Sequence, residues 1–300
     1  MLAMGAGPIP ELMTEDRADA QLQVVRRSLE CGINWIDTAA TYGDGRSEQG
    51  IGRVLTTLDA RDDIHVATKV RLMPDELQRQ PIRDIVRRSL ENSLTRLQLD
   101  RVTLLQLHNS VTKSRGDLPT SLTPEDVLGP DGVLRAMQRL REDGLVTHLG
   151  FTGLGDPVSL RQLIASGQFE TMQIPYHLLN PTAGQQADAD WVETDHGGLM
   201  NDCLAAGMGV FPIRIYAGGA LLGRPPARHT HTTKFFPMEL YKRDRQRARE
   251  LSTGLAPGQS LQAEAVRFAL AHPATSSAII GFSEPEHVDA ATTAVLSGDE

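Results

Sequence analysis

The sequence of 300 residues has few cysteines, few aromatic residues, no long apolar run and no excess of positive charge. Its two cysteines, Cys31 and Cys203, lie far apart in apolar helical patterns. They predict free buried thiols and exclude a disulfide framework or a cysteine metal motif. No apolar run approaches the roughly 18 residues of a membrane span. The net charge of −8 argues against a nucleic-acid or anionic-membrane partner, because phosphate binding needs a basic face.

The first ten residues, MLAMGAGPIP, lack the basic segment and the long apolar core of a signal peptide. We therefore expect a protein of the reducing cytoplasm. Aromatic residues make up 4% of the chain, which argues against a strongly aromatic pocket for flat apolar substrates. His229 and His231 stand two residues apart in an expected loop without further ligand candidates in a metal-binding pattern, so we expect no metal site.

What the sequence does contain is a regular alternation of short apolar runs and amphipathic stretches. Eight runs are predicted to be strands, at 2–7, 33–39, 64–70, 102–108, 146–153, 170–177, 208–215 and 276–282. Predicted helices lie between them, at 18–32, 47–58, 81–99, 133–145, 157–167, 198–207 and 260–273. Several of these end in glycine, as left-handed helix caps do, and Ser47 is expected to cap the helix that it opens. Segments 178–196 and 217–236 are expected to be long loops after strands.

Strands that alternate with helices predict βαβ units and a parallel sheet. Eight such units in a chain of this length fit a (β/α)8 TIM barrel better than an open doubly wound sheet. No Gly-x-Gly-x-x-Gly follows the first strand, which also argues against a Rossmann domain. We therefore predict a single (β/α)8 barrel domain over residues 1–300.

Polar side chains collect at the C-terminal ends of the predicted strands, where the site of such a barrel lies. Asp37 ends the second strand with Tyr42 just beyond it, Lys69 ends the third strand, and His108 ends the fourth. A lysine at the end of a buried strand is costly unless it is paired, and Asp37 is its natural partner. A buried ion pair that only fixes strand register, and a core histidine, stay open as structural alternatives.

Together these four side chains make chemical sense as a proton donor. A tyrosine has an ordinary pKa of about 10. A nearby lysine cation is expected to lower that pKa, while Asp37 keeps Lys69 charged. His108 can donate a hydrogen bond to a substrate oxygen. Such a set would protonate the alkoxide that forms when a carbonyl is reduced.

The same segments resemble motifs of the aldo-keto reductase family, in the right order and over nearly the whole chain. GINWIDTAATYGDGRSEQGIG, VATKV and LLQLHNS are similar to the family's aspartate–tyrosine, lysine and histidine motifs. GFTG, MQIPYHLLNP, GVFPIRIYAGGALLG and AIIGFSEPEHVDAA are similar to its cofactor-binding segments. The resemblance implies the (β/α)8 fold and NAD(P)-dependent reduction of an aldehyde or ketone, or the reverse. It also implies a tetrad of Asp37, Tyr42, Lys69 and His108, with Tyr42 as the general acid.

The cofactor that the resemblance implies is NADP or NAD. The residues assigned to it are Thr152, Gly153, Gln173, Ile213, Arg214, Gly218, Leu221, Gly281, Ser283 and His287. Thr152-Gly153 replaces the family's usual serine and asparagine, and Ile213 replaces its stacking aromatic residue. Gly281, Phe282 and His287 stand where the family usually has cations for the 2′-phosphate of NADP. With Glu284 close by, this slightly favours NAD, although Arg214 offers another cation. The family's N-terminal hairpin below the barrel is expected to be absent.

The expected partner is a small carbonyl or alcohol substrate, a sugar or another small metabolite. Its pocket walls are expected to include Met73, Asn109, Tyr176, Trp191 and Tyr216. The alternative is a nucleotide-sensing subunit with the same fold and tetrad, like the potassium-channel β subunits, with little turnover. The complete tetrad and the lack of a long N-terminal arm favour the enzyme. The sequence carries no signal for the oligomeric state.

Overall fold

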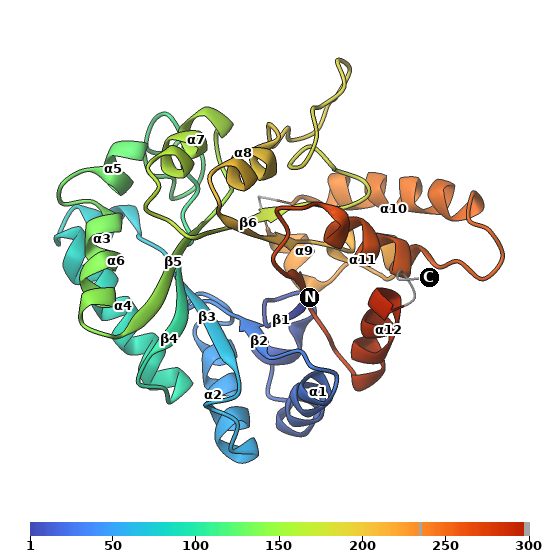
Figure 1. The fold of residues 1–300 in the computed structure, drawn as a ribbon, viewed down its shortest axis with the longest axis horizontal. Coiled ribbons are helices and arrows are strands. Elements are labelled where there is room, and N and C mark those ends of the chain that lie inside the picture. Colours follow the sequence, from blue (N-terminus) through green and yellow to red (C-terminus); the bar gives the residue numbers. More distant parts are fainter. Residues whose placement is uncertain (234–235, 297–300) are drawn as a thin grey trace.

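The computed structural model describes residues 1–233 and 236–296 of the chain. Its eight strands are β1 (Leu2–Gly5), β2 (Trp35–Asp37), β3 (His65–Val70), β4 (Val102–Leu107), β5 (Val146–Thr152), β6 (Thr171–Pro175), β7 (Gly209–Ile213) and β8 (Ala278–Ile280). They pair in parallel in the order β7-β6-β5-β4-β3-β2-β1-β8. A parallel bridge between Val210 and Thr275 brings β7 next to the residues that lead into β8. The result is a nearly closed barrel, the predicted (β/α)8 architecture (Figure 1).

At least one helix on the outside of the barrel follows each strand, and eight of these helices match the barrel pattern (Figure 1). In chain order these are α1 (Ala18–Glu30), α2 (Arg46–Leu58), α4 (Ile82–Leu97), α6 (Val133–Glu142), α7 (Pro157–Ala165), α8 (Leu199–Ala205), α11 (Leu261–Ala271) and α12 (Pro285–Leu296). Within the described residues, no helix combines the length and the apolar character that crossing a membrane requires. Both cysteines are free. Cys203 is buried as predicted, but Cys31 is half-buried, because it lies just beyond the last turn of α1.

The helix ends follow local sequence signals. At the start of α7 the Asp156 carboxylate accepts a hydrogen bond from the Ser159 amide, 2.8 Å away, and Pro157 takes the first helical position. The Ser260 hydroxyl caps α11 in the same way. Glycines with positive φ follow α1, α6, α7 and α8, as the sequence predicted: Gly32, Gly144, Gly167 and Gly207.

Several short elements and one long helix have no counterpart in the prediction. The expected loop 217–236 contains η2 (Ala217–Leu222) and α9 (Arg228–Thr232), and its residues 234–235 lie outside the described part. The other unpredicted elements are η1 (Glu11–Thr14), α3 (Pro74–Leu77), α5 (Pro124–Leu128) and α10 (Met238–Thr253). Segment 178–196 contains no helix or longer strand, as expected, and in Figure 1 the connection between β6 and α8 projects away from the barrel.

The inside of the barrel is apolar below and polar above. A cluster of buried side chains fills the lower part: Ala3, Ala67, Leu104, Phe211 and Ile279, with Trp35 and Ile213 packed against it. The Trp35 and Phe211 rings stack with their centroids 5.1 Å apart. Because side chains alternate along a strand, the residue two positions after Ala67 points into the same interior, one layer higher. That residue is Lys69, so the apolar layer supports the polar one directly.

Candidate active site

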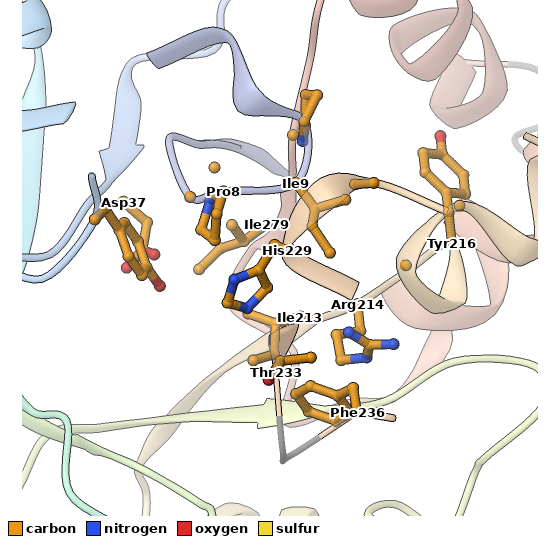
Figure 2. A pocket seen from close by; sticks show the side chains of 18 of the residues that line it. Pro8, Ile9, Asp37, Ile213, Arg214, Tyr216, His229, Thr233, Phe236 and Ile279 are labelled. Carbon is orange, nitrogen blue, oxygen red and sulfur yellow. The ribbon is translucent and has the colours of Figure 1, made fainter. Parts of the chain in front are cut away.

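A cavity of about 720 Å³ opens at the C-terminal ends of the strands. Each of the eight strands or the loop after it contributes lining residues. Figure 2 shows Asp37 at one end of this pocket and Arg214, Tyr216 and Phe236 at the other, with His229 between them. This is the face on which barrel folds of this kind carry their sites, and it is the face that the sequence predicted.

Lys69 and Asp37 form a buried ion pair at the floor of the cavity. Lys69 Nζ lies 2.6 Å from Asp37 Oδ1 and donates a second hydrogen bond, of 2.8 Å, to the Thr38 carbonyl. Lys69 is 1% exposed and Asp37 is 3% exposed. The second carboxylate oxygen accepts a hydrogen bond of 3.2 Å from Gln106, which sequence analysis did not single out. Gln106 lies two residues before His108 and beside Lys69 in the β3–β4 register, which was the signal that could have found it.

Tyr42 and His108 lie directly above this pair. Lys69 Nζ is 5.0 Å from the centroid of the Tyr42 ring. The Tyr42 and His108 rings meet edge to face, with their centroids 5.7 Å apart. His108 Nδ1 is 3.5 Å from the Thr41 hydroxyl. The structure therefore brings all four predicted residues together from three neighbouring strands and the loop after β2.

A tight turn places Tyr42 over Lys69. Gly43, Asp44 and Gly45 follow it with φ values of 58°, 54° and 87°. Successive left-handed residues reverse the chain within one turn, which glycine allows at no steric cost. The Ser47 amide then donates a hydrogen bond of 3.3 Å to the Tyr42 carbonyl.

Ser47 does not cap α2, contrary to the prediction. Gly45 occupies the cap position, and Ser47 lies inside the helix with its side chain fully buried. Its hydroxyl donates a hydrogen bond of 2.8 Å to the Ala6 carbonyl and lies 2.8 Å from the Thr38 hydroxyl. Because the Ser47 hydroxyl already bonds groups at the ends of two neighbouring strands, it does not bond the amides of α2. It thereby links the loops after β1 and β2.

Burial controls the protonation of this cluster. Burial raises the pKa of Tyr42, and the opposing effect of Lys69 is smaller, so the expected lowering of this pKa is wrong in its net direction. Burial by itself would lower the pKa of Lys69, but Asp37 and Tyr42 outweigh it and the pKa is raised. Burial, with the nearby Lys69 and Arg71 cations, holds the pKa of His108 well below its usual range. At neutral pH the phenol is therefore protonated, Lys69 charged and His108 neutral.

The residues assigned to a cofactor divide into two groups. Six of them line the cavity: Thr152, Gln173, Ile213, Arg214, Gly218 and Gly281. Gly153 faces the Met172 side chain, and Leu221 is buried among apolar residues. Ser283 and His287 lie outside the lining. His287 is connected to it through a hydrogen bond with Arg224, which does line the cavity.

Of the five expected pocket walls, Tyr216 alone lines the cavity. Tyr176 points to the outside of the barrel, where its ring stacks on Phe268 with centroids 4.7 Å apart. Side-chain alternation explains this, because Gln173 points inward and Tyr176, three residues on, takes the opposite face. Asn109 is fully buried and bonds backbone groups instead. Met73 and Trp191 are likewise not among the lining residues.

Sequence analysis missed several residues that line the cavity. They are Arg71 after β3, Arg224 and His229 after β7, and the segment 7–10 after β1. Gly281 packs against this segment, since a Cβ there would stand 2.2 Å from Pro10 Cδ. None of these residues belongs to an apolar periodicity, and only their place after a strand could have marked them. No group of three potential metal ligands gathers in the described part of the chain, around His229 or elsewhere.

Comparisons with known proteins agree with this geometry. The family described as "Aldo/keto reductase family" matches residues 2–299. The chain is 24% identical to "Uncharacterized oxidoreductase YqkF" of Bacillus subtilis (strain 168), over 93% of this chain and 84% of that protein. It is 26% identical to "D-threo-aldose 1-dehydrogenase" of a Pseudomonas species, over 95% of this chain and 85% of that protein.

Solved structures show the same fold. An aldo-keto reductase named AKR11C1 from Bacillus halodurans, in its holo form, superposes with a TM-score of 0.70 and 22% identity over 98% of this chain and 86% of that one. An aldo/keto reductase from Klebsiella pneumoniae in complex with NADP and acetate gives a TM-score of 0.66 at 20% identity, over 98% and 85%. With a barrel, a buried Asp–Lys pair beneath a tyrosine, and a family match over nearly its full length, this chain belongs to the aldo/keto reductase family.

Proposed function

We propose that this protein is a nicotinamide-dependent oxidoreductase that reduces an aldehyde or ketone to its alcohol, or catalyses the reverse reaction, with Tyr42 as general acid and base. The observation that carries the proposal is the buried cluster at the cavity floor, where the Lys69–Asp37 pair lies under Tyr42 and His108 stands beside it. Its runner-up, a nucleotide-sensing subunit of the same fold, has no separate structural observation in its favour.

The four side chains have distinct tasks. The Tyr42 phenol gives its proton to the carbonyl oxygen as negative charge develops there. The Lys69 cation stabilises the phenolate that remains, and Asp37 and the Thr38 carbonyl hold the ammonium in place. His108 is neutral and carries one N–H, with which it orients the carbonyl oxygen toward Tyr42.

The far part of the cavity fits a nicotinamide dinucleotide. Arg214 and Arg224 line it and offer charge to phosphate groups. Gly218 and Gly219, both with positive φ, leave the backbone of η2 open to close approach. When bound, the dinucleotide supplies or accepts the hydride that the protein's own side chains cannot carry. The NADP in the Klebsiella relative supports this assignment.

Turnover tests the proposal directly. NADPH and NADH oxidation is followed by absorbance with a panel of aldehydes, ketones and aldoses, and the reverse reaction is followed with the matching alcohols. The proposal expects turnover with at least one substrate that depends on the dinucleotide. Tight nucleotide binding without turnover on any member of the panel would instead establish the sensing subunit.

A further inference from the structure

Among the charged side chains that line the cavity, cations outnumber anions. Asp37 is the one carboxylate among the described lining residues, and Lys69 and Gln106 already bond its two oxygens. Three arginines line the same cavity: Arg71, Arg214 and Arg224. The cavity therefore carries an excess of positive charge, although the protein as a whole has a net charge of −8.

Two of the three arginines have partners and lie on one side. Arg214 stacks on Phe236, with its Cζ 3.7 Å from the ring centroid, and interacts with the Asp244 charge. Arg224 contacts His287. Both arginines follow β7, which in the strand order lies four positions from β3 and hence across the barrel. They belong to the part of the cavity that fits the dinucleotide phosphates.

Arg71 is on the other side and has no such partner. It directly follows β3, its Nε is buried without a hydrogen bond, and it forms no ion pair with a carboxylate in residues 1–233 or 236–296. It stands two residues after Lys69 and lines the same cavity as Tyr42 and His108, which places it on the β3 side of that cavity. Burial lowers the pKa of Arg71, but a guanidinium stays charged in proteins. A partly buried cation without a partner is costly, and an incoming oxyanion relieves that cost.

The backbone that carries Arg71 is held rigidly. The Asn109 side chain accepts a hydrogen bond of 2.9 Å from the amide of Leu72 and donates one of 2.8 Å to the Leu72 carbonyl. It also donates one of 2.6 Å to the Thr120 carbonyl. Thr120 and Ser110, on the loop after β4, line the same cavity. A cation on a fixed backbone, in a cavity that two hydroxyl-bearing residues also line, is suited to binding an anion in one orientation.

We propose that Arg71 binds an oxyanion of the substrate, so that the substrate is an aldehyde, a ketone or the matching alcohol that also carries a carboxylate or phosphate group. A guanidinium binds either group through two parallel hydrogen bonds. The identity of the substrate class rests on the proposed carbonyl chemistry, whereas the anion contact itself does not. The proposal explains why a third arginine lines the cavity on the β3 side, away from the dinucleotide part.

Matched substrates test the contact in the reaction. We suggest measuring kcat/KM for 5-oxopentanoate against its methyl ester, and for glyceraldehyde 3-phosphate against glyceraldehyde. The wild type is compared with Arg71→Met, which keeps the length of the side chain, and with Arg71→Lys, which keeps the charge. Replacing an unpartnered cation by methionine should leave the fold intact.

The expected result is a preference of about ten- to a hundredfold for the charged member of at least one pair, the size that a charge-assisted hydrogen bond supports. Arg71→Met should remove that preference, because kcat/KM for the charged member should fall about ten- to a hundredfold more than for the uncharged member, while Arg71→Lys keeps part of it. The pair that shows the effect tells whether the anion is a carboxylate or a phosphate. Equal losses for charged and uncharged substrates in Arg71→Met would overturn the proposal and make Arg71 a residue that only tunes Tyr42.

A binding measurement separates this inference from the proposed function. Calorimetric titration of glutarate and of inorganic phosphate into the protein saturated with NADP needs no turnover. If no carbonyl is reduced but one of these anions binds the wild type and not Arg71→Met, the anion site stands and the reductase proposal fails. If the wild type binds neither anion and shows no preference for charged substrates, the anion site is refuted, whatever the enzyme reduces.

Discussion

At the scale of single residues, the site depends on four ionisable side chains: Asp37, Tyr42, Lys69 and His108. Lys69 stays charged in a fully buried position because Asp37 and Tyr42 compensate the loss of water. Burial keeps Tyr42 protonated and His108 neutral. Each of these states is the one that the proposed carbonyl reduction needs at neutral pH, because its proton donor must carry a proton and its orienting imidazole must not repel Lys69.

The pH dependence of reduction follows from these shifts. A phenol with a raised pKa is protonated below that pKa, so its role as acid is lost only as pH rises through a value above about 10. His108 is neutral throughout, because its pKa lies well below 6.5. We predict that kcat/KM for reduction stays flat from pH 6 to about pH 9.5. A bell centred near pH 7 in initial-rate measurements would contradict both assignments.

The Lys69–Asp37 pair should affect stability and activity separately. Lys69→Met leaves the Asp37 carboxylate buried without its counter-ion, which should cost about 3–5 kcal/mol of unfolding free energy. The double variant Asp37→Asn with Lys69→Met removes both charges and should recover most of that loss, while carbonyl reduction stays abolished in both. Urea denaturation and initial rates measure the two effects. Equal instability of the single and the double variant would show that charge imbalance is not the cause.

At the scale of elements, the loops around the site are held by buried polar side chains and not by regular structure. Ser47 connects the loops after β1 and β2, and Asn109 connects the segment after β3 to the loop after β4. The Ser47 hydroxyl bonds one backbone group and the Asn109 amide bonds three, in places where no helix or sheet pairs these groups. The loops around the proposed catalytic cluster are therefore held by side chains that do not line the cavity themselves.

Asn109 should be one of the more sensitive residues of the chain. Asn109→Ala leaves the Leu72 amide, the Leu72 carbonyl and the Thr120 carbonyl without their partner, and should cost about 2–4 kcal/mol. Asn92→Ala, at an exposed position of α4, is the matched control and should stay within about 0.5 kcal/mol of wild type. Urea denaturation compares the two. Similar urea midpoints for both variants would show that Asn109 does not have this structural role.

The elements also show what the sequence could and could not predict. The barrel and the meeting of Asp37 with Lys69 were predictable, because strand ends in a parallel sheet share one edge. The long helix α10 was not, because only Tyr241, Asp244 and Ala248 of its residues are buried and no apolar stripe marks it. The prediction that Tyr176 lies in the pocket is wrong because it rests on the position of Tyr176 at the strand end and ignores the alternation of side chains along the strand. Gln106 could be predicted only from its register with Lys69 and its spacing from His108, and Arg71 only from its place after β3, because neither belongs to an apolar periodicity.

At the scale of the whole molecule, an acidic protein encloses a basic cavity. The net charge is −8, while three arginines line the cavity. The positive charge of the cavity favours small anionic ligands there. The negative net charge of the protein disfavours the binding of polyanions to the rest of the surface. The sequence slightly favours NAD because cations are missing from the usual positions. That interpretation leaves out Arg224, which contacts His287 in the structure.

Nucleotide selectivity should therefore depend on Arg224. Its guanidinium contacts His287, at the position where the family places a cation for the 2′-phosphate, and Tyr241 bonds its carbonyl. We predict that Arg224→Ala weakens NADP binding about tenfold and NAD binding little, because one charged hydrogen-bond partner is lost. The control is Arg228→Ala in the same segment, whose side chain is 87% exposed. Fluorescence titrations that show equal losses for both nucleotides would exclude a role in selectivity.

The proposed reaction requires Tyr42 to be the proton donor, and reduction by Tyr42→Phe, with nucleotide affinity measured in parallel, tests this most directly. The substitution removes one hydroxyl and keeps the ring that packs on His108 and Lys69. We predict that kcat at pH 7 falls by at least about a hundredfold, since general acid catalysis is lost, while the Kd for NADPH stays within about twofold. Undiminished reduction by Tyr42→Phe would contradict the account.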